Sequence, residues 1–365
     1  MTGSGTEPAR LRRQKRREAM VSLKDIAHEC DVSVATVCKA LNGYVDVSPD
    51  TKKRVFEAVE KLGYYPNATA RTLKTKRSYN LGIVYKDMAL RGLTHQYFSR
   101  VLEGFKGYAA ERGYDITFTS GMHGERKLNA LEHCQYRSVD GVLVVGVDFY
   151  DREIGDLVLS ALPTVTIDHA FERCDAVLSD NADGMRQLLR YIIYLGHKKI
   201  AFIHGTASNV TESRVNTFYS IMAENGLDVP GSYVRECNYL NTEQAAAITG
   251  DLLGMINPPT CILYPDDYCC IGGIQKIRAL GLMPGKDISV AGYDGSLIAE
   301  TFTPRITTYR QDAEEIGRIA AEKLIERISH PHLLPERVYV KGRLVVGETI
   351  QDLRIEEAIR VQENT

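Results

Sequence analysis

Hydrophobic residues near the N-terminus recur at helical spacing. In residues 23–41 one apolar face is formed by Leu23, Ile26, Ala27 and Cys30. Residues 31–33 interrupt the pattern, and Ser33 is a favourable N-cap for a second helix with Val37, Ala40 and Leu41 on its inward side. Two short helices joined by so short a turn predict a helix-turn-helix, and the alternative is a helical hairpin in an ordinary core.

A third helix is predicted directly after this pair. Residues 48–50 supply an N-cap, a proline at the first helical position and an acid in the first turn, and Gly63 is placed to end the helix. Its predicted buried stripe is Val55, Phe56, Val59 and Leu62. We expect the three helices to share one small core, made of Leu23, Ile26, Val37, Leu41, Val55, Phe56 and Leu62.

From residue 80 onward, apolar strand-like runs alternate with helical stripes, the clearest of which lies within 183–195. The predicted strands are 81–85, 115–120, 141–147, 164–168, 199–205, 260–266 and 288–294. This alternation predicts an α/β fold with parallel sheets covered by helices on both faces. The pattern alone allows one large doubly wound sheet or two lobes.

The outward positions of the first two helices suggest contact with DNA. The second helix exposes small and polar side chains, namely Val34, Ala35, Thr36 and Lys39. Such a helix can enter the major groove and approach base edges. Ser33 and Thr36 are better suited to holding phosphates.

Residues 66–79 are predicted to form a hinge. After Pro66, the stretch Asn67–Lys74 is long enough for two helical turns, which are marginal in water. Leu73 is an apolar wedge with Ala70, Arg71 and Lys74 around it, the arrangement by which proteins open a minor groove. A plain solvated linker is the alternative.

Charge is distributed unevenly along the 365 residues. The formal net charge is −2, but the first 80 residues hold 16 Lys and Arg against 9 Asp and Glu. A basic front on an acidic remainder indicates contact with a polyanion at one end only. The sequence shows no strongly apolar amphipathic helix, which favours nucleic acid over a membrane surface.

The remaining composition predicts a cytoplasmic protein without metal or membrane. Eight cysteines occur without a CxxC pair or zinc spacing, which together with the lack of a signal-peptide pattern predicts reduced thiols. No apolar run reaches the length needed to span a bilayer. Residues 1–20 predict a disordered basic tail, or a mis-assigned start in place of Met20.

Several motifs, taken in order, resemble the lactose-repressor/galactose-repressor (LacI/GalR) family of regulators. They are VSLKDIAHECDVSVATVCKALN, VSPDTKKRVFEAVEKLGYYPNATARTLKTKRSYNLGIV, YLGHKKIAFIHG, PDDY at 265–268, DISVAGYDGS and ITTYRQDAEEIG. The resemblance covers nearly the whole chain from Met20 to about Thr349. One departure is Cys38-Lys39, where the family often has Ser-Arg. A lysine is a point charge and no bidentate fork, so no base preference carries over to Lys39.

The resemblance implies a homodimeric repressor that binds a palindromic operator in double-stranded DNA and responds to a small-molecule effector. It implies that Leu73 of a hinge helix inserts at the operator centre. It also implies a core like that of periplasmic binding proteins, with two parallel-sheet lobes joined by three crossovers near 178–180, 304–308 and 326–330.

The resemblance and the sequence pattern together set the expected domain boundaries. A tail (1–20) precedes a helix-turn-helix domain (21–65), a hinge (66–79), an effector-binding and dimerisation core (80–350) and a C-terminal tail (351–365). Lobe 1 is expected at about 80–178 and 308–328, and lobe 2 at about 179–305 and 329–350.

The effector site is expected beyond the carboxyl ends of the strands, where open α/β sheets bind ligands. This rule selects residues 95–98, Asp168, residues 204–214, Asp266, Asp267 and Asp294. By the resemblance, the candidates are Phe98, Asp168, Arg214, Tyr239, Asp267 and Phe302. Carboxylates and an arginine suit paired hydroxyl groups, and aromatic faces suit a sugar-like ring. A carbohydrate is expected, with a purine-type ligand as the alternative. Plain structural roles also fit, since aspartates cap helices and phenylalanines fill cores.

Enzyme motifs are lacking. The sequence has no GxGxxG after a strand and no GxSxG, and GLMPGKD at 281–287 fails the phosphate-loop pattern. We therefore expect no enzyme and no cofactor. A transport-type sugar-binding protein and a sequence-independent DNA-binding protein stay open as other functions.

Overall fold

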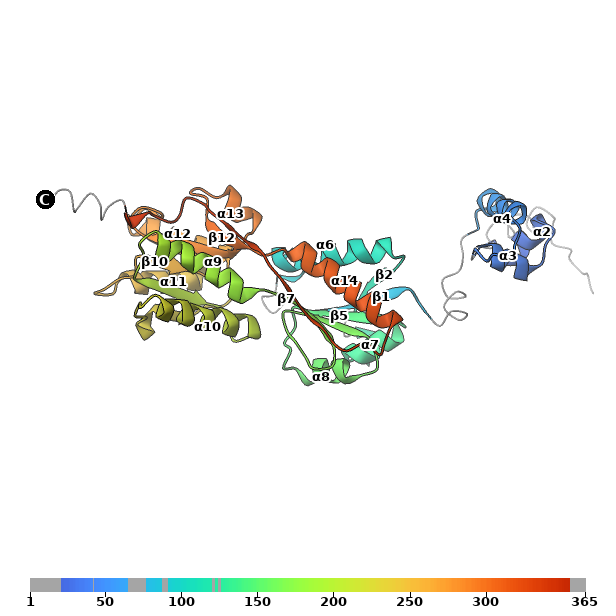
Figure 1. Ribbon diagram of the computed structural model, residues 1–365, viewed down its shortest axis with the longest axis horizontal. Helices are drawn as coiled ribbons and strands as arrows, with labels where there is room; N and C mark the ends of the chain where they lie inside the picture. The colour runs from blue at the N-terminus through green and yellow to red at the C-terminus, as the bar shows by residue number, and fades with distance from the viewer. Residues whose placement is uncertain are drawn as a thin grey trace, which may run out of the picture. The chain divides into compact units, whose positions relative to one another are not determined.

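The computed structural model describes residues 21–41, 43–64, 77–86, 91–119, 122–123 and 126–354 (Figure 1). The chain divides between Ser78 and Tyr79 into two compact units. The expected tail 1–20, most of the expected hinge and residues 355–365 lie outside the described residues. No helix within the described part is long and apolar enough to cross a membrane.

The first unit consists of three helices, α2 (Leu23–Glu29), α3 (Val34–Leu41) and α4 (Pro49–Leu62). Ser48 caps α4 by accepting a hydrogen bond from the Thr51 backbone N–H, and Gly63, with φ of 66°, ends the helix in the left-handed conformation. The helices bury one small core, made of Ile26, Ala27, Cys30, Val37, Ala40, Val47, Val55, Ala58 and Tyr64. The helix-turn-helix expected from the sequence is thereby confirmed.

Phe56 corrects the predicted core of this unit, because it is 50% exposed. The inward stripe of α4 consists of Val55, Ala58, Val59 and Leu62, at steps of 3, 4 and 7 residues. Phe56 follows Val55 directly and is rotated by about 100° around the helix, away from this stripe. Its size and apolarity predicted a buried side chain, but its place in the helical period puts it outside the buried stripe.

Lobe 1 of the second unit is a six-stranded sheet with all neighbours parallel, in the order β13-β7-β6-β5-β1-β2. Its strands are β1 (Asn80–Tyr85), β2 (Asp115–Phe118), β5 (Gly141–Val145), β6 (Thr164–Ile167), β7 (Asp175–Ser179) and β13 (Arg337–Val340). Its other elements are η1 (Gly92–Thr94), α6 (Gln96–Glu111), β3 (Met122–His123), β4 (Arg126–Lys127), α7 (Ala130–Tyr136), α8 (Arg152–Leu159) and α14 (Ala313–Ser329). Helices α6 and α14 cover one face, and α7 and α8 the other.

Lobe 2 is also six-stranded, in the order β14-β12-β11-β10-β8-β9, and only β14 runs antiparallel to its neighbour. Its strands are β8 (Ile200–His204), β9 (Val234–Glu236), β10 (Cys261–Leu263), β11 (Ser289–Asp294), β12 (Thr307–Arg310) and β14 (Arg343–Val345). Its helices are α9 (Asn181–Tyr194), α10 (Asn209–Glu224), η2 (Gly231–Tyr233), α11 (Thr242–Leu253), α12 (Asp267–Ala279) and α13 (Leu297–Thr301). Helices α9 and α10 pack on one face, and α11 and α12 on the other.

The chain crosses between the lobes three times, but two crossovers lie later than the sequence predicted. The first follows β7, as expected near 178–180. The second lies between Arg310 and Ala313, because β12 extends the lobe 2 sheet beside β11. The third lies between Val340 and Arg343, because β13 adds an edge strand to lobe 1 beside β7. Strand β13 alternates exposed residues with the half-buried Val338 and the buried Val340, so it lacks the apolar run that marks a central strand.

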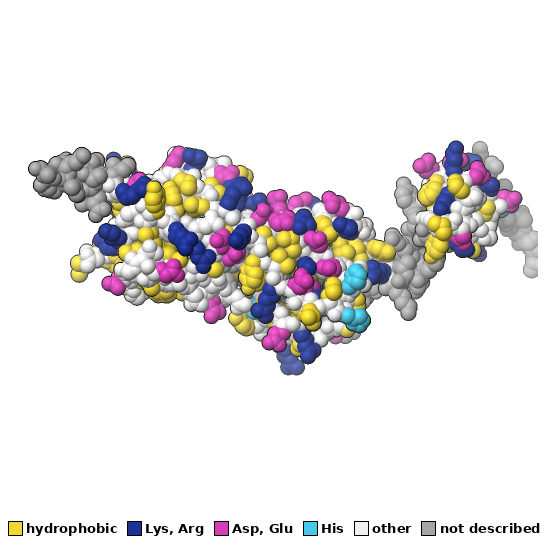
Figure 2. All heavy atoms as spheres, in the orientation of Figure 1, with side chains coloured by type: hydrophobic (Ala, Val, Ile, Leu, Met, Phe, Trp, Pro, Cys, Tyr) yellow, Lys and Arg dark blue, Asp and Glu magenta, His cyan; other side chains and the backbone are white. Residues whose placement is uncertain are grey.

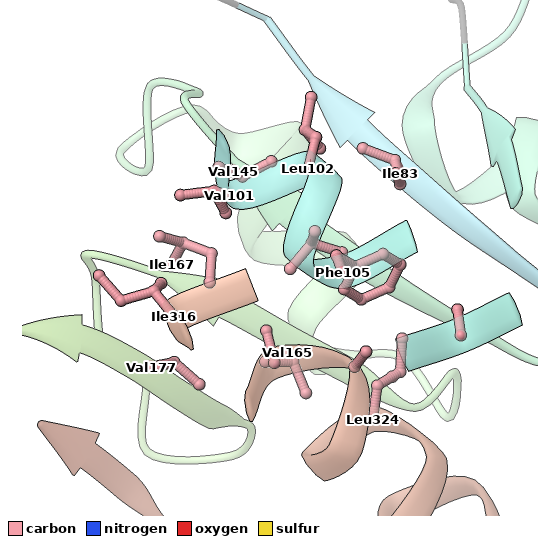
Figure 3. Packing of buried hydrophobic residues seen from close by; sticks show 14 of the residues in the cluster. Ile83, Val101, Leu102, Phe105, Val145, Val165, Ile167, Val177, Ile316 and Leu324 are labelled. Carbon is pink, nitrogen blue, oxygen red and sulfur yellow. The ribbon is translucent and has the colours of Figure 1, made fainter. Parts of the chain in front are cut away.

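Close packing of α14 against α6 holds the segment between the second and third crossovers on lobe 1. Both helices contribute to the core cluster that includes Phe105, Ile316 and Leu324 (Figure 3). A Cβ on Gly104 would lie 2.0 Å from the backbone oxygen of Glu314, and one on Gly317 would lie 1.8 Å from that of Val101. Only glycine allows this approach, since neither obstacle is a side chain that can move aside.

We predict that Gly104→Ala lowers the free energy of unfolding of the core by about 1–3 kcal/mol, because the added methyl group must push the two helices apart. Urea unfolding followed by circular dichroism measures the change.

Gly107 of the same helix provides a matched control, because it is exposed and nothing lies within 4 Å of an added Cβ. Gly107→Ala should raise the free energy of unfolding by about 0.5–1 kcal/mol through helix propensity alone. Equal effects of the two substitutions would show that the α6–α14 approach imposes no constraint.

Candidate functional site

Helix α3 presents the side chains that the sequence assigned to DNA contact. The backbone N–H of Thr36 donates to Ser33 Oγ at 3.0 Å, so Ser33 caps the helix. Ser33, Val34, Ala35 and Lys39 are exposed and Thr36 is half-buried, while Val37 and Ala40 are inside. The short turn between α2 and α3 includes Asp31 with φ of 50° and is closed by a hydrogen bond from Val32 N to Ala27 O. A helix presented in this way can approach base edges.

Lys39 is already engaged within its own unit. Its Nζ lies 2.5 Å from Oδ2 of Asp46, in the loop that leads to α4, and both side chains are half-exposed. The other DNA-contact candidates, Asn67, Ala70, Arg71, Leu73 and Lys74, lie outside the described residues.

A cleft lies between the two lobes of the core. It encloses a cavity of about 20 Å³, lined from lobe 1 and lobe 2 by His95, Gln96, Tyr97, Arg100, Leu240, Asp267, Tyr268, Asp294, Ser296 and Ala313. Hydrogen bonds cross the cleft from Arg91 Nη2 to Leu240 O, at 3.4 Å, and from Tyr150 to Asn209 Oδ1, at 3.3 Å. The lobes therefore contact each other at their strand ends, where the sequence predicted the effector site.

Arg214 is the buried cation of the cleft region and is only 4% exposed. Its Nε donates to Asn181 Oδ1 at 2.8 Å, and its Nη1 donates to the carbonyl of Pro265 at 3.0 Å. Its guanidinium carbon lies 3.6 Å from the centre of the Tyr293 ring. These contacts join the first crossover, the end of β10 and strand β11 through one side chain.

Two carboxylates face this arginine from opposite lobes. Asp168 accepts hydrogen bonds from the Tyr97 hydroxyl at 2.7 Å and from the Ser179 backbone N–H at 3.1 Å. Asp294 accepts one from Gln311 Nε2 at 2.6 Å. Burial raises the pKa of Asp168, and it raises the pKa of Asp294 to about 6 while the charge of Arg214 opposes the rise.

The backbone at the cleft is strained. Asp168, Leu240 and Asp294 have φ angles of 60°, 59° and 96°, in the left-handed region that side chains other than glycine rarely adopt. Asp168 directly follows β6, Asp294 ends β11, and Leu240 precedes the N-cap of α11. Such strain gathers at binding sites because the surrounding structure must hold it in place.

Asp267 lines the cavity and is also held by hydrogen bonds within its own lobe. It is 1% exposed, and its carboxylate accepts from Ser296 N and Oγ at 2.7 Å and from Thr308 Oγ1 at 2.6 Å. Burial raises its pKa to about 7, and the nearby Asp294 adds to the rise. In this structure Asp267 therefore supports the turn that carries Asp294.

The three aromatic candidates lie in different surroundings. Tyr239 lies over Gly205, and its hydroxyl is 2.9 Å from Thr211 Oγ1, one helical turn before Arg214. Phe98 packs among the rings of Tyr85, His95 and Tyr97. Of the six candidates, only Asp267 lines the cavity, and the others, Phe98, Asp168, Arg214, Tyr239 and Phe302, do not. Phe302 packs against the lobe 2 core below α13.

Several side chains of this site were not predicted from the sequence. Arg100, Tyr268 and Ser296 line the cavity, while Asn181 and Tyr293 hold Arg214. Tyr268 and Ser296 directly follow or nearly follow aspartates that the strand-end rule selected. Nothing in the sequence pattern pointed to Asn181 or Tyr293, since their contacts depend on how α9 and β11 meet α10.

Two family models match the chain. One, described as bacterial regulatory proteins of the lacI family, matches residues 22–67, and another, a periplasmic binding protein-like domain, matches residues 189–350. The chain belongs to the LacI/GalR family.

Curated relatives of this LacI/GalR chain are repressors by name. The probable HTH-type transcriptional repressor ExuR of Bacillus subtilis (strain 168) is 27% identical over 92% of this chain and 99% of its own length. PurR of Vibrio parahaemolyticus is 28% identical over 92% and 100%. The ribose operon repressor of Haemophilus influenzae is 27% identical over 92% and 100%.

Solved structures share the fold. The lac repressor dimer bound to operator and the anti-inducer ONPF aligns with a TM-score of 0.75 at 23% identity, over 91% of this chain and 100% of that one. The complex of the regulator CelR with cellobiose aligns with a TM-score of 0.66 at 24% identity, over 90% and 99%. The two-lobed core expected from the family resemblance is thus confirmed, and one large doubly wound sheet is excluded.

We predict that the buried Asp267 carboxyl makes the stability of this LacI/GalR core fall as the pH rises. Its pKa of about 7 in the folded state exceeds the ordinary value of 3.8, so the proton is held more tightly when folded. The resulting stability is full below the unfolded pKa and is lost as the pH rises through the folded pKa. From pH 5 to pH 8, the free energy of unfolding of Asp267→Asn should rise by about 1–3 kcal/mol relative to that of the wild type, measured by urea unfolding.

Thr308→Val serves as the control, because it removes one hydrogen bond to Asp267 and keeps the carboxyl. It should lower stability and keep a fall in stability with rising pH at least as large as that of the wild type, because the lost hydrogen bond had lowered the pKa of Asp267. If the free energies of unfolding of the wild type and of Asp267→Asn differed by the same amount at pH 5 and pH 8, Asp267 would not be the source of the pH dependence.

Proposed function

We propose that this protein is a transcriptional repressor whose affinity for a palindromic operator is set by a small-molecule effector bound between the lobes. One observation carries the proposal: a helix-turn-helix with an exposed face on α3 shares its chain with a two-lobed core whose strand ends bring together Arg214, Asp168 and Asp294. The first part fits DNA, and the second fits a small polar ligand.

In this proposal α3 enters the major groove. Val34, Ala35 and Lys39 lie nearest the bases, while Ser33 and Thr36 hold phosphates. The segment with Asn67, Ala70, Arg71, Leu73 and Lys74 acts at the minor groove, where Leu73 inserts as a wedge. The names of the relatives, which are repressors, support this assignment.

The effector we propose is an uncharged carbohydrate. Asp168 and Asp294 accept hydrogen bonds from hydroxyl groups, and Arg214 donates to them. Two carboxylates beside one guanidinium disfavour an anionic ligand, since its charge would meet excess negative charge in a site of low polarity. The buried Oε1 of Gln96 has no hydrogen-bond partner among the described residues, which suits a hydroxyl donor from a ligand.

We also propose that the protein acts as a homodimer, because a palindrome presents two equivalent half-sites. A groove of about 410 Å³ spans both lobes and is lined by Leu93, Thr94, Gln96, Ser99, Tyr268, Leu297, Ile298 and Thr301. Leu93 and Leu297 are 58% and 63% exposed, and this is the face on which we expect the second copy.

The test has two parts. Operator selection from a randomised duplex library, followed by fluorescence anisotropy, should yield a palindrome bound at least 10³-fold more tightly than random DNA. A thermal-shift screen of the full chain with matched pairs, such as glucose with glucuronate, should favour neutral sugars. Equal affinity for all duplexes would leave a sequence-independent DNA-binding protein instead.

We predict that Arg214→Lys removes the response to the effector identified in that screen and leaves operator affinity without effector within about threefold. The lysine keeps the buried charge, but it loses the paired contacts to Asn181 and Pro265. Isothermal titration should show at least tenfold weaker effector binding.

Arg318, on the exposed side of α14 and paired with Glu315 and Glu322, offers a control for the same chemical change. Arg318→Lys should leave both effector and operator binding unchanged. A normal effector response in Arg214→Lys would remove Arg214 from the site.

A further inference from the structure

The recognition face of α3 carries an ion pair. Lys39, in the last turn of α3, and Asp46, in the loop that leads to α4, meet through Nζ and Oδ2 at 2.5 Å. The Tyr44 backbone N–H donates to the carbonyl of Lys39 at 3.1 Å, so the chain folds back on the end of the helix. The hydrogen bond between the two side chains raises the pKa of Lys39 and lowers that of Asp46.

Stability does not explain why the pair should lie there. Both side chains are about half-exposed, and exposed ion pairs contribute little to folding. The position is what distinguishes it. Lys39 lies three and four residues after Thr36 and Ala35, so it shares their face of α3 and points to where the bases are expected.

An ammonium group held in this way has donors to spare. It carries three N–H donors, and Asp46 Oδ2 uses one of them. The others can reach a guanine O6 or N7 while the ion pair persists. At the same time the carboxylate offsets the lysine's charge, which weakens attraction to phosphates in every sequence.

Lys52 shows the contrast within the same unit. Its Nζ donates to the backbone carbonyl of Gly43 at 3.3 Å, in the same loop as Asp46. A carbonyl group does not cancel the charge, and Lys52 acts on Asp46 only through its charge and not through a hydrogen bond, so Lys52 is the less compensated cation. The loop thus holds Lys39 in a direct ion pair and Lys52 through a carbonyl group.

We infer that Asp46 is a positioning residue for DNA recognition, which fixes the Lys39 ammonium on the face of α3 so that Lys39 selects a base instead of adding general attraction to DNA. The inference rests on the proposed function. It adds a role for an acidic residue in a unit that must bind a polyanion.

The unit supplies its own matched control. Glu29 and Lys61 form a second ion pair, with Oε1 and Nζ 2.6 Å apart, but Glu29 ends α2 and Lys61 lies in the last turn of α4. Asp46→Asn and Glu29→Gln each replace one carboxylate by an amide, and each leaves one exposed lysine without its ion partner. Only the first touches the face of α3.

The experiment measures the affinity of the full chain for its selected operator, for every single-base variant of one half-site, and for random duplex, at several salt concentrations. In Asp46→Asn, discrimination at one base pair per half-site should fall about tenfold. Affinity for random DNA should rise, and the slope of log affinity against log salt should steepen by about 0.9, one further phosphate contact. Glu29→Gln should leave discrimination within about twofold at every position.

Two further variants separate positioning from a merely structural role. Asp46→Glu keeps the charge within reach of Lys39 and should retain the base preference. In a Lys39→Met background, Asp46→Asn should change base preference no further, because the lysine through which it acts is gone.

The outcomes are distinct. A wild-type protein that prefers no sequence overturns the inference together with the proposed function. Two other outcomes overturn the inference alone, both with a wild type that has a clear operator. In one, Asp46→Asn leaves the base preference unchanged. In the other, Glu29→Gln alters the base preference as much as Asp46→Asn does.

Discussion

The core depends on how one buried guanidinium is held. A charge taken out of water is tolerated only when it is paired and hydrogen-bonded. Arg214 meets this condition by gathering Asn181 from the first crossover, the Pro265 carbonyl from the end of β10 and the ring of Tyr293 from β11. Those three elements cannot move independently without leaving a buried charge unsatisfied. The arginine thereby fixes the lobe 2 wall of the cleft before any ligand arrives.

The carboxylates near Arg214 are the groups to which a ligand can bind. Asp294 and Asp168 approach the same region from different lobes, and burial raises the pKa of both. Hydroxyl groups placed between them would supply the hydrogen bonds that burial has removed. Because the two carboxylates belong to different lobes, a ligand that bound both would change the balance between lobe positions. Asp267 stands behind this arrangement and holds the Asp294 turn through Ser296 and Thr308.

Local periodicity in the sequence predicted the elements whose burial pattern is clearest. The three N-terminal helices, the seven apolar strands and the α9 stripe all appear, because burial on a regular element leaves a regular pattern. Phe56 was misplaced because of its size. Five strands of the two large sheets were missed because their residues mix polar and apolar types, namely β7, β9, β12, β13 and β14. The strand-end rule located Asp168, Asp294 and the region of Arg214. It could not show that Asp267, besides lining the cavity, also supports the turn that carries Asp294, since those contacts depend on the three-dimensional structure.

The distribution of charge along the chain bears on the proposed recognition of DNA. On the face of the core that Figure 2 shows, acidic and basic side chains are interspersed, with no large area of one sign. By the sequence, the excess of bases lies within the first 80 residues. Yet a unit that only maximised positive charge would bind all DNA, and genomic DNA in excess would hold it away from its operator. An acidic residue beside a reading lysine lowers general affinity more than specific affinity. The ion pair on α3 is therefore as much a part of the proposed recognition as the small side chains that precede it.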